Sequence, residues 1–437
     1  MLQDPLGLDR QMRQTARALT SFRAELRQGR GADHAFEFLG GRTSIELIRE
    51  LADTPHDPLA PALLRWALHL HEEHALVDLD VAHATAFRAT RHPIDAPERG
   101  DYTLRDFLEH ALADTKGQRA TWLRLLVERA ERATDLAVRR AERRVEVRAD
   151  LTRFVPAVFL GEGAPAREVA ERWLAETDEA FATLGVETLA DLFDVGLGRD
   201  SRATWPARVT PRSLAELFRE TRWLTDAAPE TNLAVTPFGA SSFLRALYRF
   251  GASLRAALTD ERRPFTLAHD TFGFEHATFG SLFATLPFNP AFAKRALGVS
   301  ASGMADHRRT LARVLLVASR EAALKTLLFA ASFDGRKRLA EAYAEWTFRA
   351  LGAPLEPTAF GVLFTPRSHD STRFTSRFVA SELDARLVNE HDEDWYRNPR
   401  AVEELRETAR LPAPSHAEPA VLEQGAQRLA AALREAL

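Results

Sequence analysis

The sequence predicts a mainly α-helical fold: a large multi-helix body with a few short strands at most. Two patterns carry this prediction. Apolar residues recur at steps of three and four along most of the 437-residue chain, which is the spacing of one helix face. Hydrophobic residues make up 45% and charged residues 27%, the average composition of globular proteins, so a packed core is expected.

The N-terminal part of the chain is expected to contain helices only. The segment TSIELIRELAD begins with Thr43 and Ser44 ahead of Glu46, a pattern typical of a helix N-cap. Prolines break the pattern over 55–61. The helices are expected at 8–29, at 43–53, at 61–79, and as one or two long helices from Leu104 to about Val155.

A linker-like stretch, VPAVFLGEGAPAREV, favours a domain boundary near 155–165. We therefore expect an N-terminal helical region, 1–155, and a second helical region, 156–437. Glycine, proline, serine and threonine gather near 195–240 and 353–366, where short strands are expected. The remaining helices are expected at 166–185, 212–224, 240–258, 275–297, 303–332, 334–350, 370–390, 398–410 and 418–436.

Charge and cysteine content exclude several classes of function. The net charge of −4 and the pI of about 6.4 argue against a surface that neutralises nucleic-acid phosphates. The absence of cysteine excludes disulfides and thiolate metal sites and fits the reducing cytoplasm. The most apolar stretch, 311–332, carries Arg313, Arg320, Glu321 and Lys325, which would be costly in lipid. We expect a cytoplasmic protein that does not insert into membranes.

Two polar patterns in the N-terminal region favour solvent-exposed surfaces. The run HLHEEH, 69–74, places His69 and Glu73 on one helical face, and His71 and His74 share another, but it spells no HExxH motif. A surface polar cluster is the favoured interpretation, and a metal site is the alternative. Intermixed acidic and arginine residues over 127–153 are typical of a solvated helix face.

A third polar group lies among phenylalanines in HDTFGFEHATFGSLFATL, residues 269–286. It contains His269, Asp270, Glu275 and His276. A histidine in such surroundings is commonly a hydrogen-bonded core residue. The alternative is a metal site, because the HExxH motif of zinc peptidases combines two histidines with a glutamate base on one helix.

The order of elements over 205–410 resembles that of the helical zinc metallopeptidases typified by thimet oligopeptidase and oligoendopeptidase. In that family an HExGH helix is followed about 25 residues later by a helix with the third ligand, then by a helical tail with substrate-binding tyrosines. The corresponding segments here are HATFG at 276–280, MADHRRTLARVLL at 304–316, RFTSRFVASELDARL at 373–387 and DWYRNPRAVEELRE at 394–407.

The chain departs from this family at the residues that carry its chemistry. With His276 at the first ligand position, Ala277 replaces the catalytic glutamate and Gly280 replaces the second histidine. Asp306 or His307 falls near the position of the third ligand. Phenylalanines stand where the family's tyrosines are expected, at Phe374 and Phe378.

Because an intact HExxH motif is absent, the leading hypothesis is a non-catalytic protein without a cofactor, whose groove binds a peptide or protein partner. The first alternative is a metallohydrolase with a non-standard zinc site, in which His269, His276 and His307 converge beside Glu275 or Asp306. The second alternative is a helical scaffold unrelated to the peptidases.

Overall fold

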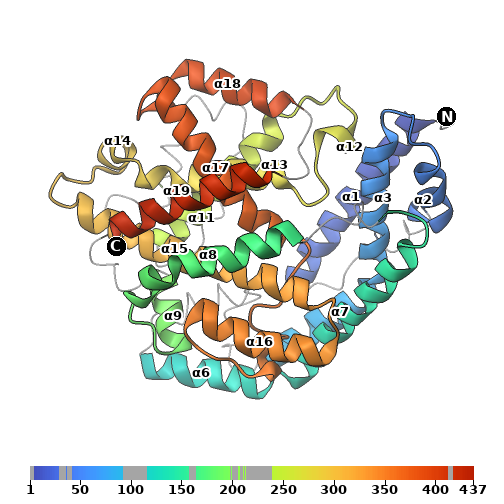
Figure 1. The fold of residues 1–437 in the computed structure, drawn as a ribbon, viewed down its shortest axis with the longest axis horizontal. Coiled ribbons are helices and arrows are strands. Elements are labelled where there is room, and N and C mark those ends of the chain that lie inside the picture. The colour runs from blue at the N-terminus through green and yellow to red at the C-terminus, as the bar shows by residue number, and fades with distance from the viewer. Residues whose placement is uncertain are drawn as a thin grey trace.

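The computed structural model confirms the mainly α-helical fold (Figure 1). It describes residues 4–28, 36, 42–91, 116–156, 164–196, 198, 205–206, 210, 212, 239–411 and 417–437. Seventeen α-helices and no strand occur in these ranges. The helix predicted at 212–224 and most of the strand region predicted at 195–240 lie outside them.

In the N-terminal region the helices predicted at 8–29 and 43–53 begin and end within three residues of the observed ones. The helix predicted at 61–79 ends at Ala75, and a separate helix that was not predicted follows over Val77–Arg91. The described part of the segment predicted from Leu104 to about Val155 contains two helices. Ser44 is the N-cap of the second helix, because its hydroxyl accepts a hydrogen bond from the backbone N–H of Leu47 at 3.3 Å. These helices are α1 (Pro5–Gln28), α2 (Ile45–Ala52), α3 (Ala60–Ala75), α4 (Val77–Arg91), α6 (Lys116–Glu128) and α7 (Glu131–Leu151).

The described residues of the rest of the chain also form mainly helices. Their order is α8 (Ala164–Ala182), α9 (Leu189–Gly196), α11 (Ala240–Leu258), α12 (Phe265–Ala268), α13 (Phe274–Thr285), α14 (Pro290–Phe292), α15 (Met304–Ala331), α16 (Arg336–Leu351), α17 (Asp370–His391), α18 (Pro399–Arg410) and α19 (Pro419–Ala436), with short turns η7 (Leu286–Phe288), η8 (Ala293–Leu297), η9 (Pro357–Ala359) and η10 (Trp395–Arg397).

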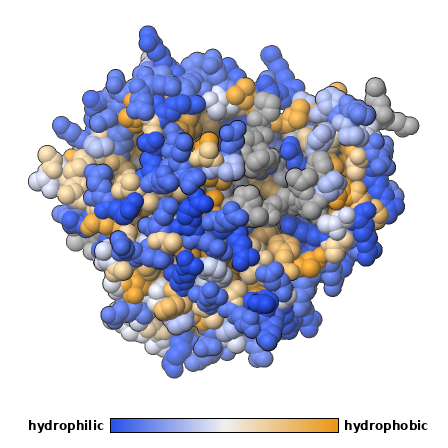
Figure 2. Space-filling model, in the orientation of Figure 1, coloured by the Kyte–Doolittle hydropathy of each residue, from blue (hydrophilic) through white to orange (hydrophobic). Residues whose placement is uncertain are grey.

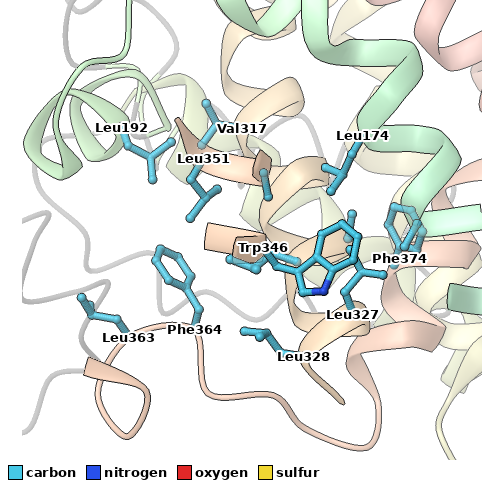
Figure 3. Packing of buried hydrophobic residues seen from close by; sticks show 14 of the residues in the cluster. Leu174, Leu192, Val317, Leu327, Leu328, Trp346, Leu351, Leu363, Phe364 and Phe374 are labelled. Carbon is cyan, nitrogen blue, oxygen red and sulfur yellow. The ribbon is translucent and has the colours of Figure 1, made fainter. Parts of the chain in front are cut away.

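Three clusters of buried apolar side chains hold these helices together. The N-terminal core joins α1, α2 and α3 with the last turns of α7. The central core gathers α8, α9, α15, α16, α17 and α19 around the first half of α7, and Figure 3 shows part of it. The C-terminal core packs α11 and α13 against α18 and the turn at Trp395. Helix α7 therefore contributes to two cores, on either side of its midpoint.

Helices α11 and α13 pack with almost no side chain between their backbones. A Cβ at Gly280 of α13 would lie 2.8 Å from Cε2 of Tyr248 and 2.9 Å from the carbonyl oxygen of Tyr248. A Cβ at Gly251 of α11 would in turn collide with the carbonyl group of Phe279. Glycine at both positions therefore permits the close crossing that places α13.

Two predictions about secondary structure are wrong. The helix predicted at 275–297 ends at Thr285, because Pro287 and Pro290 each start a new short turn. The segment 353–366 forms no strand: it turns through η9, and Leu363 and Phe364 point into the central core (Figure 3). The apolar residues that suggested a strand are core contacts of a tightly turned loop.

The domain boundary predicted near 155–165 falls between α7 and α8, and the division into two regions stays a prediction. Within the described ranges, no helix is long and apolar enough to cross a membrane. The face drawn in Figure 2 is mainly hydrophilic, with apolar residues scattered over it.

We expect Gly280→Ala to lower the free energy of unfolding by about 1–3 kcal/mol, because the added methyl group forces α11 and α13 apart. Gly117→Ala is the control, since a Cβ there meets nothing within 4 Å and alanine favours a helix by about 0.5–1 kcal/mol. Urea unfolding monitored by circular dichroism measures both. A Gly280→Ala variant as stable as the original chain would contradict the close crossing.

Candidate functional site

Three of the five predicted site residues come together at the start of α13. Nδ1 of His269 lies 3.3 Å from Nε2 of His276 and 3.5 Å from Oε1 of Glu275, and that oxygen lies 3.3 Å from Nε2 of His276. The three atoms could hold a single metal ion. The carboxylate is buried, whereas the side chains of His269 and His276 are 24% and 27% exposed, so solvent reaches the imidazoles but not the carboxylate.

The turn that precedes α13 places these side chains. Gly273 adopts a left-handed conformation with φ of 70°, which reverses the chain before α13 begins. The side chain of Asp270 accepts hydrogen bonds from the backbone N–H groups of Phe272 at 2.9 Å and Phe274 at 3.3 Å. These two hydrogen bonds support the turn. The backbone N–H of Asp270 donates to both carboxylate oxygens of Glu275 at 3.3 Å.

Helix α11 orients His276. The Nδ1 atom of His276 donates to the carbonyl of Ala252 at 3.2 Å, which leaves the lone pair of Nε2 directed at the other two groups. Burial lowers the pKa of His276, so its imidazole is neutral near pH 7, the form that binds metals. His269 and His276 stack with ring centroids 5.4 Å apart.

Two carboxyl groups of the site have shifted pKa values in opposite directions. Burial alone would raise the pKa of Glu275, but the hydrogen bond with His269 and the charges of His276 and Arg255 lower it. Burial and the neighbouring charge of Glu275 raise the pKa of Asp270 to about 7. The site therefore holds one carboxylate that stays ionised and one carboxyl group that titrates near neutral pH.

The other two predicted site residues lie elsewhere. Asp306 is exposed and forms an ion pair with Arg309 at 3.0 Å. His307 is buried, its Nε2 donates to the carbonyl of Pro287 at 3.3 Å, and its ring packs beside Trp205. The convergence of His307 with the other two histidines, which the metallohydrolase alternative requires, is wrong, because the group of donor atoms at this site contains His269, Glu275 and His276 but not His307.

The polar run at 69–74 is not the surface cluster that the sequence predicted. His69, Glu72 and Glu73 are buried, and Glu72 binds Arg144 and Arg148 of α7 at 2.6 Å each. Arg144 is 2% exposed, so the solvated face predicted for 127–153 is wrong along this edge of α7. The error has a simple cause, because alternating charges describe a buried ion-pair face and an exposed one equally well.

A second buried carboxylate extends this network to α1 and to the turn before α17. Glu73 binds Arg23 at 2.8 Å and accepts a hydrogen bond from the hydroxyl of Ser368 at 3.3 Å. Burial alone would raise the pKa of Glu73, but Arg23 and the other nearby cations hold it far below its usual value. The network therefore ties α1, α3 and α7 to the C-terminal half through charges that must stay ionised.

A further group of donor atoms was not predicted from the sequence. Glu390, His391 and Glu404 lie together at the end of α17 and on α18. His391 and Arg386 each contact a different oxygen of Glu404 at 2.8 Å, so that carboxylate already has two partners. This group is a surface ion-pair cluster.

Comparisons with protein-family models, with curated proteins and with solved structures match nothing. The resemblance to helical zinc metallopeptidases therefore stays a prediction. In the structure Gly280, the position that this resemblance would assign to a second histidine, lies against the backbone of α11. A histidine side chain has no room there.

We expect Glu72→Gln to lower the free energy of unfolding by about 3–5 kcal/mol at pH 7, because Arg144 and Arg148 would stay buried and both lose their ion pairs with Glu72. Glu142→Gln is the matched control: Glu142 pairs with Arg336 at an exposed site, and a loss below about 1 kcal/mol is expected. Denaturant unfolding measures both. Equal losses of unfolding free energy in the two variants would contradict the claim that burial makes the ion pairs of Glu72 more important for stability.

Acid should weaken the same network. In spite of burial, Arg148 and Arg144 lower the pKa of Glu72 below its unfolded value of 4.5. Its contribution to stability is therefore complete above about pH 4.5 and is lost as the pH falls through the folded pKa. We expect the free energy of unfolding to decrease below that pH, with a shallower slope in Glu72→Gln. Identical slopes in the two proteins would show that folding does not lower the pKa of Glu72.

Proposed function

We propose that the chain binds one divalent transition-metal ion through Nδ1 of His269, Oε1 of Glu275 and Nε2 of His276. The observation that carries the proposal is the spacing of these atoms, 3.3, 3.3 and 3.5 Å. In tetrahedral coordination with bonds of about 2.0–2.1 Å, neighbouring ligand atoms lie about 3.3–3.4 Å apart. The three atoms thus already outline one face of such a tetrahedron.

The donor chemistry supports the same conclusion. Two imidazoles and one carboxylate suit zinc, and they also suit iron, cobalt and nickel. Structural zinc sites usually have four protein ligands, whereas sites with three ligands keep a position open for water or substrate. Two of the three ligands also have a second partner that fixes their orientation: the carbonyl of Ala252 for His276 and the backbone N–H of Asp270 for Glu275.

We expect the purified, dialysed protein to bind Zn²⁺ with a stoichiometry of one, measured by calorimetry and by mass spectrometry. His276→Ala should weaken binding more than about 100-fold, beyond the 10–100-fold typical for loss of an outer partner. His56→Ala, at an exposed histidine outside the cluster, is the matched control and should bind as the original chain does. At 100 times Kd the metal should add about 2.7 kcal/mol of stability, which a chelator removes.

The same atomic spacing also arises from hydrogen bonds among two imidazoles and a carboxylate. Failure to bind Zn²⁺, Co²⁺ or Ni²⁺ at micromolar concentration would therefore assign the cluster to hydrogen bonding and refute the proposal. Binding that survives in His276→Ala would place the metal elsewhere, and the surface cluster at Glu390, His391 and Glu404 would be tested next.

A second candidate function is metal-dependent hydrolysis, and the exposure of the two imidazoles favours it. A divalent ion with an open position lowers the pKa of a bound water and so supplies a nucleophile at neutral pH. His269 and His276, each about a quarter exposed, leave the site open to water and substrate. The leading hypothesis from the sequence, a non-catalytic protein whose groove binds a peptide or protein partner, needs no metal at all and stays a prediction.

We expect the zinc-loaded protein to hydrolyse at least one member of a panel of activated esters, phosphoesters and short peptides. Activity should disappear in His276→Ala and persist in His56→Ala, which excludes a contaminating enzyme. A protein that binds zinc tightly but shows no turnover with any substrate class would leave metal binding standing and remove hydrolysis.

A further inference from the structure

The short helix α12 ends immediately before His269. Its first residues are capped by a side chain from the N-terminal part of the sequence. The Asp9 side chain of α1 accepts two hydrogen bonds of 2.8 Å, from the backbone N–H of Phe265 to Oδ2 and from the backbone N–H of Thr266 to Oδ1. The hydroxyl of Thr266 donates to Oδ1 at the same distance. Pro264, the helix's own N-cap residue, supplies no side-chain hydrogen bond. The start of α12 is therefore held by a carboxylate 256 residues away.

The other end of α12 is held by α3. The indole N–H of Trp66 donates to the carbonyl of His269 at 3.1 Å. The ring of Trp66 packs against Phe265 with centroids 4.7 Å apart, and Phe265 in turn contacts the imidazole of His269 at 5.0 Å. The backbone of His269 is thus attached to the N-terminal helices, while its imidazole points at Glu275 and His276 of α13.

We infer that Asp9 and Trp66 are positioning residues that set the metal affinity of the cluster formed by His269, Glu275 and His276. This inference rests on the proposed metal binding. Glu275 and His276 are neighbours in one turn of α13, so the helix fixes the separation of their backbones, and the carbonyl of Ala252 and the N–H of Asp270 orient their side chains. Only His269 comes from another element, and its placement decides whether all three donor atoms meet.

Helix α12 cannot hold His269 in place by itself. It has four residues, far fewer than a helix needs to be stable in isolation. A metal site requires its ligands within about 0.5 Å of the working geometry, so the ends of α12 need external support. Figure 1 shows α12 between the N-terminal helices α1 and α3 and the helix α13. The support comes from Asp9 at one end and Trp66 at the other.

Metal binding and the docking of α1 and α3 are therefore linked. If these helices place His269 for the metal, the metal must stabilise their contact with α12 by the same free energy. The cluster then acts as a staple between the N-terminal helices and α13, and metal occupancy controls how firmly the two parts are joined.

The decisive experiment measures Co²⁺ affinity by calorimetry and Co²⁺ coordination by visible absorption. Asp9→Ala should raise Kd about tenfold, the effect typical of losing an outer-shell support, and should keep the stoichiometry of one. Asp4→Ala is the matched control, because Asp4 caps α1 itself at the exposed N–H of Gly7 and should change Kd less than about twofold. Asp9→Asn retains one accepting oxygen and should recover part of the affinity.

Trp66→Phe provides an independent variant, since it deletes the indole N–H and keeps an aromatic ring beside Phe265. It should also raise Kd about tenfold. Trp205→Phe is its control: the indole nitrogen of Trp205 has no hydrogen-bond partner among the described residues, and that ring lies beside His307. Shifted Co²⁺ absorption bands at saturating metal would show altered coordination, which a general loss of stability does not produce.

The outcomes separate the inference from the function on which it rests. If the original chain binds no Co²⁺, both fall together. If it binds Co²⁺ and His276→Ala abolishes binding, while Asp9→Ala and Trp66→Phe both match the original chain, only the positioning role is overturned. Should Asp9→Ala fail to fold, as judged by circular dichroism, Trp66→Phe and Asp9→Asn decide the question.

Discussion

The close crossing of α11 and α13 is the constraint on which the candidate site depends. Gly251 and Gly280 allow the two backbones to touch, and only at that separation does His276 reach the carbonyl of Ala252. The same hydrogen bond selects which ring nitrogen faces Glu275 and His269. The close packing at two glycines therefore determines the tautomer of His276, a candidate metal ligand.

The N-terminal helices contribute to the site through two different kinds of contact. The buried network of Glu72 and Glu73 with arginines of α1 and α7 fixes these helices relative to one another and to the turn at Ser368. Once they are fixed, Asp9 and Trp66 present a cap and an indole N–H to α12. The ion pairs thus fix the N-terminal helices, and the hydrogen bonds of Asp9 and Trp66 then locate His269.

Local patterns in the sequence predicted what depends on neighbours along the chain. Helix α11 was predicted residue for residue, because its apolar spacing and its flanking residues are local signals. His269, Glu275 and His276 were recognised as a candidate group because they lie within eight consecutive residues. The burial of Glu72, the remote cap from Asp9 and the isolation of His307 were not predictable, since each depends on segments distant in sequence. A run of charged residues does not indicate whether its side chains contact water or another helix.

Because the ribosome synthesises the chain from its N-terminus, the packing of α12 also affects how the chain folds during synthesis. Phe265 and Leu267 pack against the N-terminal core, whose other residues all belong to the first 155 positions. During synthesis the residues of that core emerge early, and the side that α12 covers stays exposed until more than a hundred further residues have been added. The nascent N-terminal helices thus expose apolar surface while those residues are added, and the arrival of a four-residue helix covers it.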